Sequence, residues 1–390
     1  MKILFKLALL SILIYLTADI AIRNDEGGSR PIVQAIGGIS LILVSWYNLR
    51  NLSIYSKLSS RLTFFKFWRL FIGLMIIYYC IGFNSIPSYH VTNSPRDLVI
   101  AIYIFAVALF FFYGTIRQHL SVGLLNTLII VVLFNGLFEI FYAFITARNI
   151  DGVDVINTSA GYIFVMILPL LLFKFQKYNI WIFIIALILT MLTGKRGALV
   201  IFIFLFLYGL YNFRWIKKTF KLNWKILFFL VLIVFGYLFF IDSAFESLEY
   251  RLLTIQDEKR NMIASGRDVI WQTLLTKWLD SDFIGIIFGY GFFATISLGG
   301  NFAHNDFIEF LVDFGVIGLI VYSLVLIFYL RNIGWIKKMN RYLKVLLLFC
   351  FLIWLGRAII AGTIRTDQII LSMSIGYLFG IAIKQKFLYE

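Results

Sequence analysis

One histidine in the second half of the chain has the residue type and the setting expected of a proton acceptor at a membrane edge. His304 ends a long polar stretch, 243–305, and an apolar run follows it directly. An imidazole with an ordinary pKa of about 6.5 can take a proton from a hydroxyl group near neutral pH. The structural alternative is a helix-start residue whose ring meets water. His90 and His119 fit a structural role better, because neither has a comparable polar setting.

Two arginines could hold an anionic group beside that histidine. Arg196 lies in a very short turn, 193–197, between two apolar stretches, so its position is well defined. A guanidinium there can bind a phosphate through two parallel hydrogen bonds. Arg267 opens an amphipathic stretch, where the backbone amides of a helix start add positive field. The alternatives are an interfacial cation at Arg196, and an ion pair of Arg267 with Asp268 or Glu258.

Acidic side chains follow the histidine at intervals of three and four residues. Asp306, Glu309 and Asp313 therefore share one face of a predicted helix. A charge inside a bilayer is costly unless it is paired. We expect Asp313 to pair with Arg357, which lies at a similar depth in a later apolar stretch, and Glu139 is the rival partner. Such a pair holds helices in register and shapes a cavity without doing chemistry.

Two further patterns are too weak to carry a function. The acidic pair Asp280 and Asp282 has the spacing of metal ligands, but such residues are common at helix ends. The glycine-rich segment 289–294 fits a dinucleotide fingerprint by letter, yet no strand precedes it in a βαβ unit. The sequence has no Walker motif and no cluster of metal-ligating His and Cys. We therefore predict neither a metal nor a cofactor.

The elements that must position these residues are membrane-spanning helices. The chain has 390 residues, of which 61% are hydrophobic and 14% charged, and its mean hydropathy is +0.92. Because only a helix satisfies its own backbone hydrogen bonds in hydrocarbon, about twelve apolar stretches predict an all-α polytopic membrane protein. These stretches are 3–22, 31–48, 67–86, 98–115, 122–146, 158–173, 179–193, 196–213, 226–242, 306–330, 346–364 and 369–383.

Charge placement predicts the topology. The segments assigned to the cytoplasm hold most of the 35 Lys and Arg residues and one acidic residue, Glu390. This bias puts both termini in the cytoplasm and the long polar loop outside. The first apolar stretch lacks a small-residue cleavage site and is expected to be retained as a helix. The net charge of +15 then reflects topology and anionic lipid headgroups, and needs no nucleic acid.

Three parts follow from this topology. Residues 1–242 form nine spans, 243–305 form one large periplasmic loop with amphipathic helices, and 306–390 form three spans and a cytoplasmic tail. Within the loop, apolar residues of 267–282 recur every three or four positions, which predicts a helix on or near the membrane surface. Cys80 and Cys350 both fall in apolar stretches far apart in sequence, so no disulfide is predicted.

Four short motifs, taken in order, resemble the O-antigen ligase and polymerase family of bacterial envelopes. They cover 193–320, about a third of the chain. The motifs are Thr193-Gly194-Lys195-Arg196-Gly197-Ala198, then Ser265-Gly266-Arg267 with Trp271, then Gly289-Tyr290-Gly291, and finally His304-Asn305-Asp306-Phe307-Ile308-Glu309 with Phe314-Gly315 and Gly318. Lys195 is a mild departure, because relatives often carry a small polar residue at that position.

The resemblance implies a GT-C-like glycosyltransferase of the bacterial inner membrane with its active site on the periplasmic side. The implied donor is an oligosaccharide linked to undecaprenyl diphosphate, and the implied reaction is inverting and metal-independent. By position, Arg196 and Arg267 match the family's diphosphate-binding arginines and His304 matches its proposed base. Membrane lipids and a chain-length regulator are the further partners implied.

Ligase and polymerase share this donor and differ in acceptor, which is lipid A core for a ligase and another lipid-linked repeat unit for a polymerase. The compact loop, its Gly-Tyr-Gly segment and the Asn-Asp-Phe-Ile-Glu-Phe run favour a polymerase, and a ligase is the alternative. A lipid-linked oligosaccharide flippase would need internal pseudo-symmetry and a charged central cavity, and neither is visible. A cell-wall glycan polymerase and a sensor or scaffold are weaker alternatives.

Overall fold

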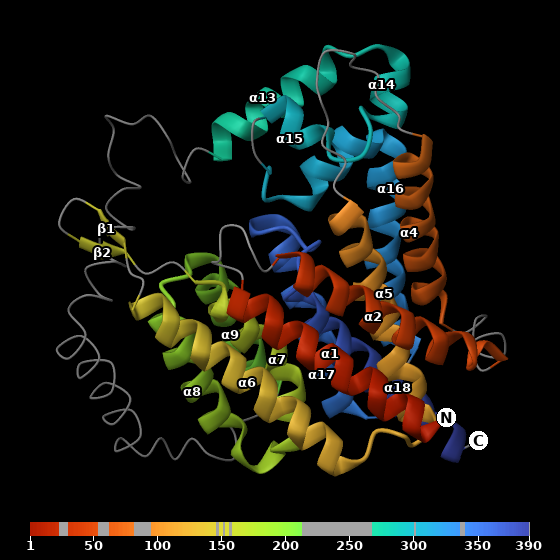
Figure 1. Cartoon of the computed structure of the whole chain (residues 1–390), viewed down its shortest axis with the longest axis vertical. Helices are drawn as coiled ribbons and strands as arrows, with labels where there is room; N and C mark the ends of the chain where they lie inside the picture. Colours follow the sequence, from red (N-terminus) through yellow and green to blue (C-terminus); the bar gives the residue numbers. More distant parts are fainter. Residues whose placement is uncertain are drawn as a thin grey trace.

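The computed structural model describes residues 1–22, 30–53, 62–81, 95–145, 148–150, 153–155, 158–212, 267–299, 302–335 and 340–389. Apolar runs form most of these residues into helices, and one short antiparallel hairpin pairs β1 with β2 (Figure 1). The elements before the cap are α1 (Lys2–Ile22), α2 (Arg30–Leu49), α4 (Thr63–Ile81), α5 (Pro95–Ile116), α6 (Val122–Ile145), β1 (Arg148–Ile150), β2 (Val153–Val155), α7 (Ala160–Lys174), η1 (Gln176–Tyr178), α8 (Asn179–Leu192) and α9 (Arg196–Asn212). After them come α13 (Arg267–Leu279), α14 (Phe283–Phe288), α15 (Ala294–Gly299), α16 (Asp306–Trp335), α17 (Arg341–Ile360) and α18 (Gln368–Tyr389).

The chain is a helical, polytopic membrane protein, as predicted. Among the residues that the structure describes, 7 helices are long and apolar enough to cross a membrane, or up to 8 if a bent pair counts as one span. That pair is α7 with η1 and α8, and it bends by 116° between two stretches predicted as separate spans. The predicted span 226–242 lies outside the described residues.

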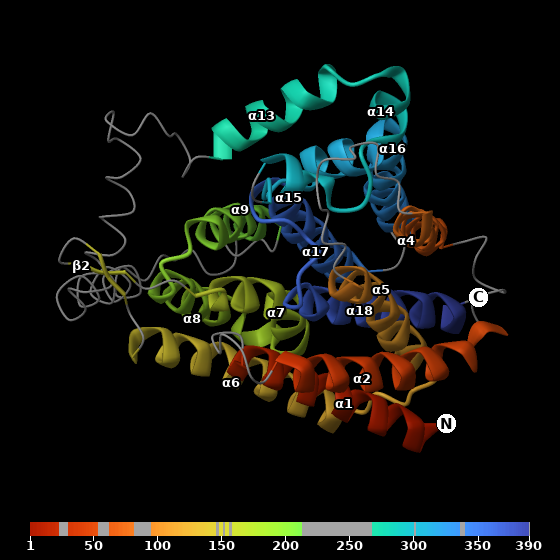
Figure 2. The ribbon, with the colours of Figure 1, turned by 45° about the horizontal axis from the view of Figure 1, so that its top comes forward.

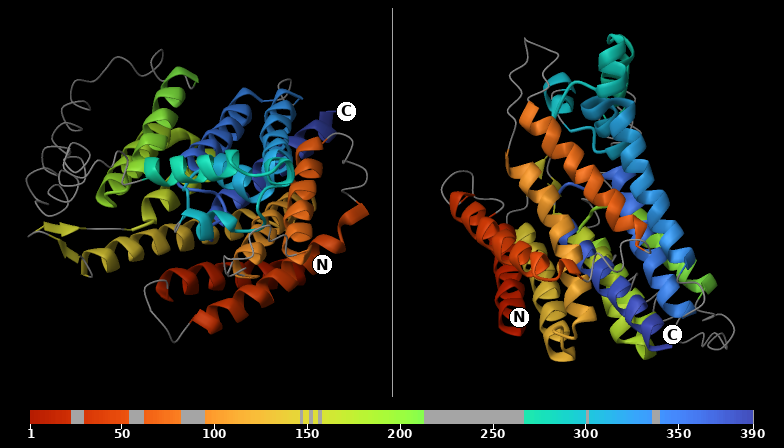
Figure 3. Two further views of the ribbon diagram at one scale, coloured as in Figure 1. Left: turned by 90° about the horizontal axis from the view of Figure 1, so that it is seen from above. Right: turned by 90° about the vertical axis from the view of Figure 1, so that its right-hand side faces the viewer.

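Helices far apart in sequence pack side by side in the bundle. Helix α18 runs along α5, and α16 runs along α4, as Figure 3 shows. Both chain ends lie at one end of the bundle, and α13, α14 and α15 lie at the other (Figure 1). We call the described residues of these three helices and their connections, 267–299 and 302–305, the cap. The side of the membrane on which the termini lie stays a prediction from the charge pattern.

The cap is a small packed layer above the bundle. Figure 2 shows α13 lying above α15 and the first turns of α16. Leu274 of α13 is fully buried against Leu298 of α15 and Val312 of α16. Because the apolar side of α13 is covered in this way, the predicted amphipathic helix packs on protein. Residues 213–266, which include the start of the predicted loop, lie outside the described residues.

The cap is joined to the bundle where α16 breaks. Gly315 has φ 64° and ψ −165°, so the helix is interrupted more than two turns after its start at Asp306. The freed carbonyls of Val312 and Asp313 accept hydrogen bonds from the backbone N–H groups of Tyr290 and Gly291, at 2.9 Å each. Gly289 crosses the break so closely that a β-carbon there would overlap the backbone of Asp313 and Gly315. The Gly-Tyr-Gly and Phe-Gly motifs are thus two sides of one crossing.

We predict that Gly315→Ala destabilises the protein and that Gly334→Ala, in the same helix, does not. A β-carbon at Gly315 would collide with the carbonyl of Ile287 and sit at a positive φ, whereas nothing lies within 4 Å of one at Gly334. Overpacking of this kind costs about 1–3 kcal/mol. Thermal unfolding in detergent, followed by the loss of monodisperse protein, measures the effect. Equal midpoints for the two variants would show that the crossing is not tightly packed.

Candidate functional site

His304 lies at the junction of the cap and α16, in a conformation that several bonds hold. Its φ is 55°, a left-handed value that non-glycine residues seldom adopt. The backbone N–H of His304 donates to the Glu309 carboxylate at 2.9 Å, and the indole of Trp271 donates to the carbonyl of Ala303 at 2.6 Å. Asn305 caps α16 by accepting from the N–H of Phe307. The ring of His304 is half-buried, and these contacts hold the backbone from which it extends.

Arg267 and His304 meet at the carboxyl end of α17. The guanidinium of Arg267 donates to the carbonyl of Ile360 at 2.6 Å, and the ring of His304 donates to the carbonyl of Ala361, the next residue. Arg267 is the first residue of α13, so the cap carries this cation to the bundle. The structure thus brings together two of the three residues that the sequence singled out.

Arg196 reaches the same place from the turn between α8 and α9. Gly194 takes a left-handed φ of 59° and Thr193 donates from its hydroxyl to Thr190, which makes the turn tight and places Arg196 at the first position of α9. The Arg196 and Arg267 guanidiniums lie close enough to repel each other electrostatically, and the neighbouring Lys195 acts on His304.

Cations dominate the surroundings of His304, which lies outside the spanning helices. Its pKa falls from 6.5 to about 4, first because burial disfavours the charged ring, and then because Arg365, Arg267 and Lys195 are close. The hydrogen bond to Ala361 opposes this shift. The imidazole is therefore neutral at physiological pH and keeps a lone pair for a proton.

Arg365, which sequence reasoning passed over, is the nearest of these cations. Its guanidinium lies 3.4 Å from Nδ1 of His304 and 5.5 Å from the centre of the Phe302 ring. Arg365 occupies the loop between α17 and α18, residues 361–367, which we call the α17–α18 loop. The signal that singled out Arg196, a cation in a short loop between apolar stretches, is present here too.

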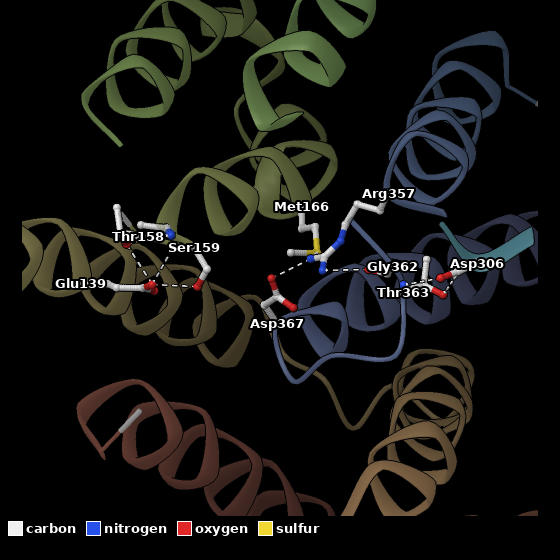
Figure 4. Close-up of polar contacts among 10 residues, drawn as sticks. Glu139, Thr158, Ser159, Met166, Asp306, Arg357, Gly362, Thr363 and Asp367 are labelled. Atoms are coloured by element: carbon white, nitrogen blue, oxygen red, sulfur yellow. Dashed lines mark hydrogen bonds and ion pairs between the residues drawn. The ribbon is translucent and has the colours of Figure 1, made fainter. Parts of the chain in front are cut away.

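The α17–α18 loop is fixed by buried charges rather than by regular structure. Arg357 donates to the carboxylate of Asp367 at 2.6 Å and to the carbonyl of Gly362 at 3.1 Å, and both charged side chains are buried (Figure 4). From the other side, the carboxylate of Asp306 accepts from the N–H and hydroxyl of Thr363. These bonds clamp both halves of the loop.

The predicted pairing of Asp313 with Arg357 is wrong. The alternative pairing of Arg357 with Glu139 is wrong as well. Asp313 accepts from the N–H and hydroxyl of Thr295 at 2.8 and 2.6 Å, because the break at Gly315 turns the first part of α16 toward the cap. Glu139 accepts from residues 158 and 159 at the start of α7, as Figure 4 shows. Arg357 finds its partner, Asp367, only ten residues away.

The acidic pair Asp280 and Asp282 lies in the cap and has a local structural explanation. Asp282 accepts from the N–H of Gly285 at 2.7 Å and so caps α14, while Asp280 is exposed at the end of α13. Within the described ranges, no group of three or more His, Cys, Asp or Glu could hold a metal ion. What the junction does offer is a half-buried neutral imidazole among four cations, which suits binding of a multiply charged anion beside a group that accepts a proton.

We predict that Asp367→Ala lowers stability sharply, by about 3–5 kcal/mol, because it leaves the buried Arg357 charge without its carboxylate. The double variant Arg357→Met/Asp367→Leu removes both charges and should recover most of the loss. Thermal unfolding of the purified variants measures both effects. If the double variant is no more stable than the single one, the pair is not what holds the loop.

The comparison with protein families agrees with the residues assembled at this junction. Residues 181–323 match the sequence model of a family described as O-antigen ligase, and this segment contains Arg196, Arg267 and His304. No curated protein matches the chain. The match indicates a glycosyltransferase-like membrane enzyme of O-antigen assembly, and the resemblance drawn from the four motifs is confirmed. Over residues 181–323 the chain thus matches the O-antigen ligase family model, and in this segment it is similar to the O-antigen ligase and polymerase family.

Proposed function

We propose that this chain is an O-antigen polymerase that joins undecaprenyl-diphosphate-linked repeat units on the periplasmic side of the inner membrane. The observation that carries the proposal is the convergence of Arg267, Arg365 and Lys195 on a neutral His304, with Arg196 beside Arg267. An anion with two phosphates would relieve the repulsion among these cations, and a lipid tail would keep it at the edge of the bundle.

In the proposed step an acceptor sugar hydroxyl attacks the anomeric carbon of the donor sugar. Its proton moves to Nδ1 of His304, and the new bond joins the acceptor oxygen to the anomeric carbon. The bond between that carbon and the phosphate oxygen breaks, and its electron pair leaves with the lipid diphosphate. Attack opposite the leaving group inverts the anomeric configuration. No external oxidant or cofactor is needed for this balance.

Arg196 and Arg267 are assigned to the leaving group. Negative charge on the diphosphate grows as its bond to the sugar breaks, so guanidiniums held in place stabilise the transition state more than the bound substrate. Both residues begin helices, which fixes their backbone positions before any substrate arrives. Arg267 is also bonded to the end of α17, which sets its distance from the histidine.

A ligase is the alternative within the same chemistry. The feature that favours a polymerase is the compact cap: its Gly-Tyr-Gly segment crosses α16 directly and buries Gly289 and Gly291. A flippase remains the alternative of another class. Buried charges among the described residues are held in fixed bonds, as with Arg357 and Asp367 in the α17–α18 loop and Asp313 in the cap, which suits a rigid site better than a translocation path.

We predict that His304→Ala, Arg196→Ala and Arg267→Ala each abolish polysaccharide laddering when they replace the wild-type chain in a deletion strain. Removing one transition-state donor lowers rates by about 100- to 1000-fold, which is enough to erase long chains. Arg50→Ala is the matched control, because Arg50 is an exposed arginine stacked on Trp46 at 5.6 Å, far from the cap. Membrane levels of each variant must equal those of the wild type.

The same strains separate the alternatives. Lipid A core that carries a single repeat unit indicates a polymerase. Core without any O-antigen, together with accumulated lipid-linked polymer, indicates a ligase. Normal laddering in the His304→Ala strain would sink the transferase assignment altogether.

The pH dependence should report the lowered pKa of His304. Only the neutral ring accepts a proton, so kcat/KM, which reflects the free enzyme, should hold at pH 5.5 to 6.5 and fall as pH approaches about 4. In the substrate complex the diphosphate favours the charged ring, so the acid limb of kcat should lie at higher pH than that of kcat/KM. Rates of the purified protein with a lipid-linked donor measure both. An acid limb of kcat/KM at or above about 6.5 contradicts the assignment.

A further inference from the structure

Arg365 is placed so that its side chain can move while its backbone cannot. The α17–α18 loop is pinned on one side by Gly362 and Thr363 and on the other by Asp367. Thr366 is buried as well, whereas Arg365 itself is exposed. Because the backbone of the loop is held, the guanidinium of Arg365 can reach only positions within one side-chain length of it. The ring of His304 is within that reach.

The contact between Arg365 and His304 fixes which ring nitrogen holds the lone pair. A guanidinium has donors only, so Nδ1 of His304, 3.4 Å away, must be the acceptor. The proton of the neutral ring is then on Nε2. Because a neutral imidazole has one lone pair, Arg365 covers the only atom of His304 that could take a proton from a substrate.

The length of this contact makes it easy to exchange. At 3.4 Å it is longer than the 2.7–2.9 Å or so that is typical of a guanidinium bonded to an anionic oxygen. Arg365 also lies over the Phe302 ring, at 5.5 Å, which supports the guanidinium close to the histidine. A phosphate oxygen arriving at the junction would therefore be a better partner for Arg365 than the ring nitrogen is.

We propose that Arg365 alternates between two partners, donating to Nδ1 of His304 in the empty site and to the donor's diphosphate in the loaded site. The inference rests on the proposed function for its second partner and deepens it. Binding of the donor thereby uncovers the base, and the acceptor hydroxyl can give its proton to Nδ1 as in the step above. Without a donor, the covered nitrogen cannot activate a hydroxyl.

Other groups around the ring do not compete for this role. Arg267 is engaged with the carbonyl of Ile360. Lys195 acts on the ring from the turn before α9, and Glu309 accepts from the backbone N–H of His304. Asp306, which faces the same loop, is bonded to Thr363. Arg365 is the charged group whose bond to the ring itself is seen.

The first test needs no enzymatic activity. Diethyl pyrocarbonate reacts with neutral imidazole, and peptide mass spectrometry follows the modification at residue 304 as a function of pH. In Arg365→Gln the half-point of this titration should rise from about 4 toward the ordinary value, because the closest cation is gone. Arg331→Gln is the matched control: Arg331 is also exposed and stacked on a phenylalanine, Phe328, at 5.5 Å. An unchanged half-point in Arg365→Gln overturns the claim that Arg365 pairs with His304 in the empty site.

Inorganic pyrophosphate tests the second partner in the same assay. In the wild-type protein it should raise the half-point of His304, because an anion binds and Arg365 leaves the ring. The rise should be smaller in Arg365→Gln and undiminished in Arg331→Gln. Equal rises in all three proteins overturn the claim that Arg365 moves to the diphosphate when the site is loaded. If Arg365→Gln does not fold, Arg365→Met takes its place in both titrations, because it also removes the charge and the hydrogen bonds.

Kinetics complete the test and separate it from the proposed function. Arg365→Gln should lower kcat/KM for a lipid-linked donor about 10- to 100-fold, the range for loss of one hydrogen bond to a charged group, while Arg331→Gln stays within about twofold. A normal kcat/KM in Arg365→Gln overturns the exchange. If the titrations behave as expected and no donor is turned over by the wild type, the proposed function fails and the pairing of Arg365 with His304 stands.

Discussion

Three buried charges hold the loop on which the site is built. Arg357 and Asp367 clamp the α17–α18 loop from within the bundle, and Asp306 clamps it from the first turn of α16. Charges of this kind are costly to bury, and pairing with an opposite charge or with hydrogen-bond donors offsets that cost. Because each bond reaches a different segment, moving any one of these segments would expose an unpaired charge. The rigidity of the junction follows from that constraint.

The same arrangement separates acidic from basic groups. The carboxylates of Asp306, Glu309 and Asp313 accept hydrogen bonds from backbone and hydroxyl donors inside the structure. The cations that surround His304 come instead from the ends of helices and from a loop. Like charges gathered without a bound anion repel one another, so the empty site favours any ligand with several negative oxygens. The lipid-linked diphosphate of the proposed reaction is a ligand of this kind.

The cap is the part that makes this separation possible. Arg267 begins α13, and Trp271 of the same helix donates to the residue before His304. Its connection to the bundle passes through the crossing of Gly289 over Gly315, which leaves no room for a side chain. The cap therefore delivers one cation and one imidazole with fixed positions, although it is attached to α16 by only a few bonds.

Much of this could be predicted from sequence because the strongest signals are local. Long apolar runs predict spanning helices, and a cation in a short turn is positioned by that turn, as with Arg196. The break at Gly315 could not be foreseen, because a glycine inside an apolar run is compatible with a continuous helix. The error over Asp313 and Arg357 follows from it, since depths counted along a straight helix pair the wrong groups. Arg365 carries the same local signal as Arg196, but only its contact with His304, 61 residues away, shows its importance.

The most direct measurement is a structure of the protein with a lipid-diphosphate-linked sugar bound. We predict that the phosphates lie within hydrogen-bond distance of Arg196 and Arg267, and that the anomeric carbon is within reach of a hydroxyl held at Nδ1 of His304. A diphosphate bound away from these arginines, or a sugar on the far side of the cap from the ring, would contradict it.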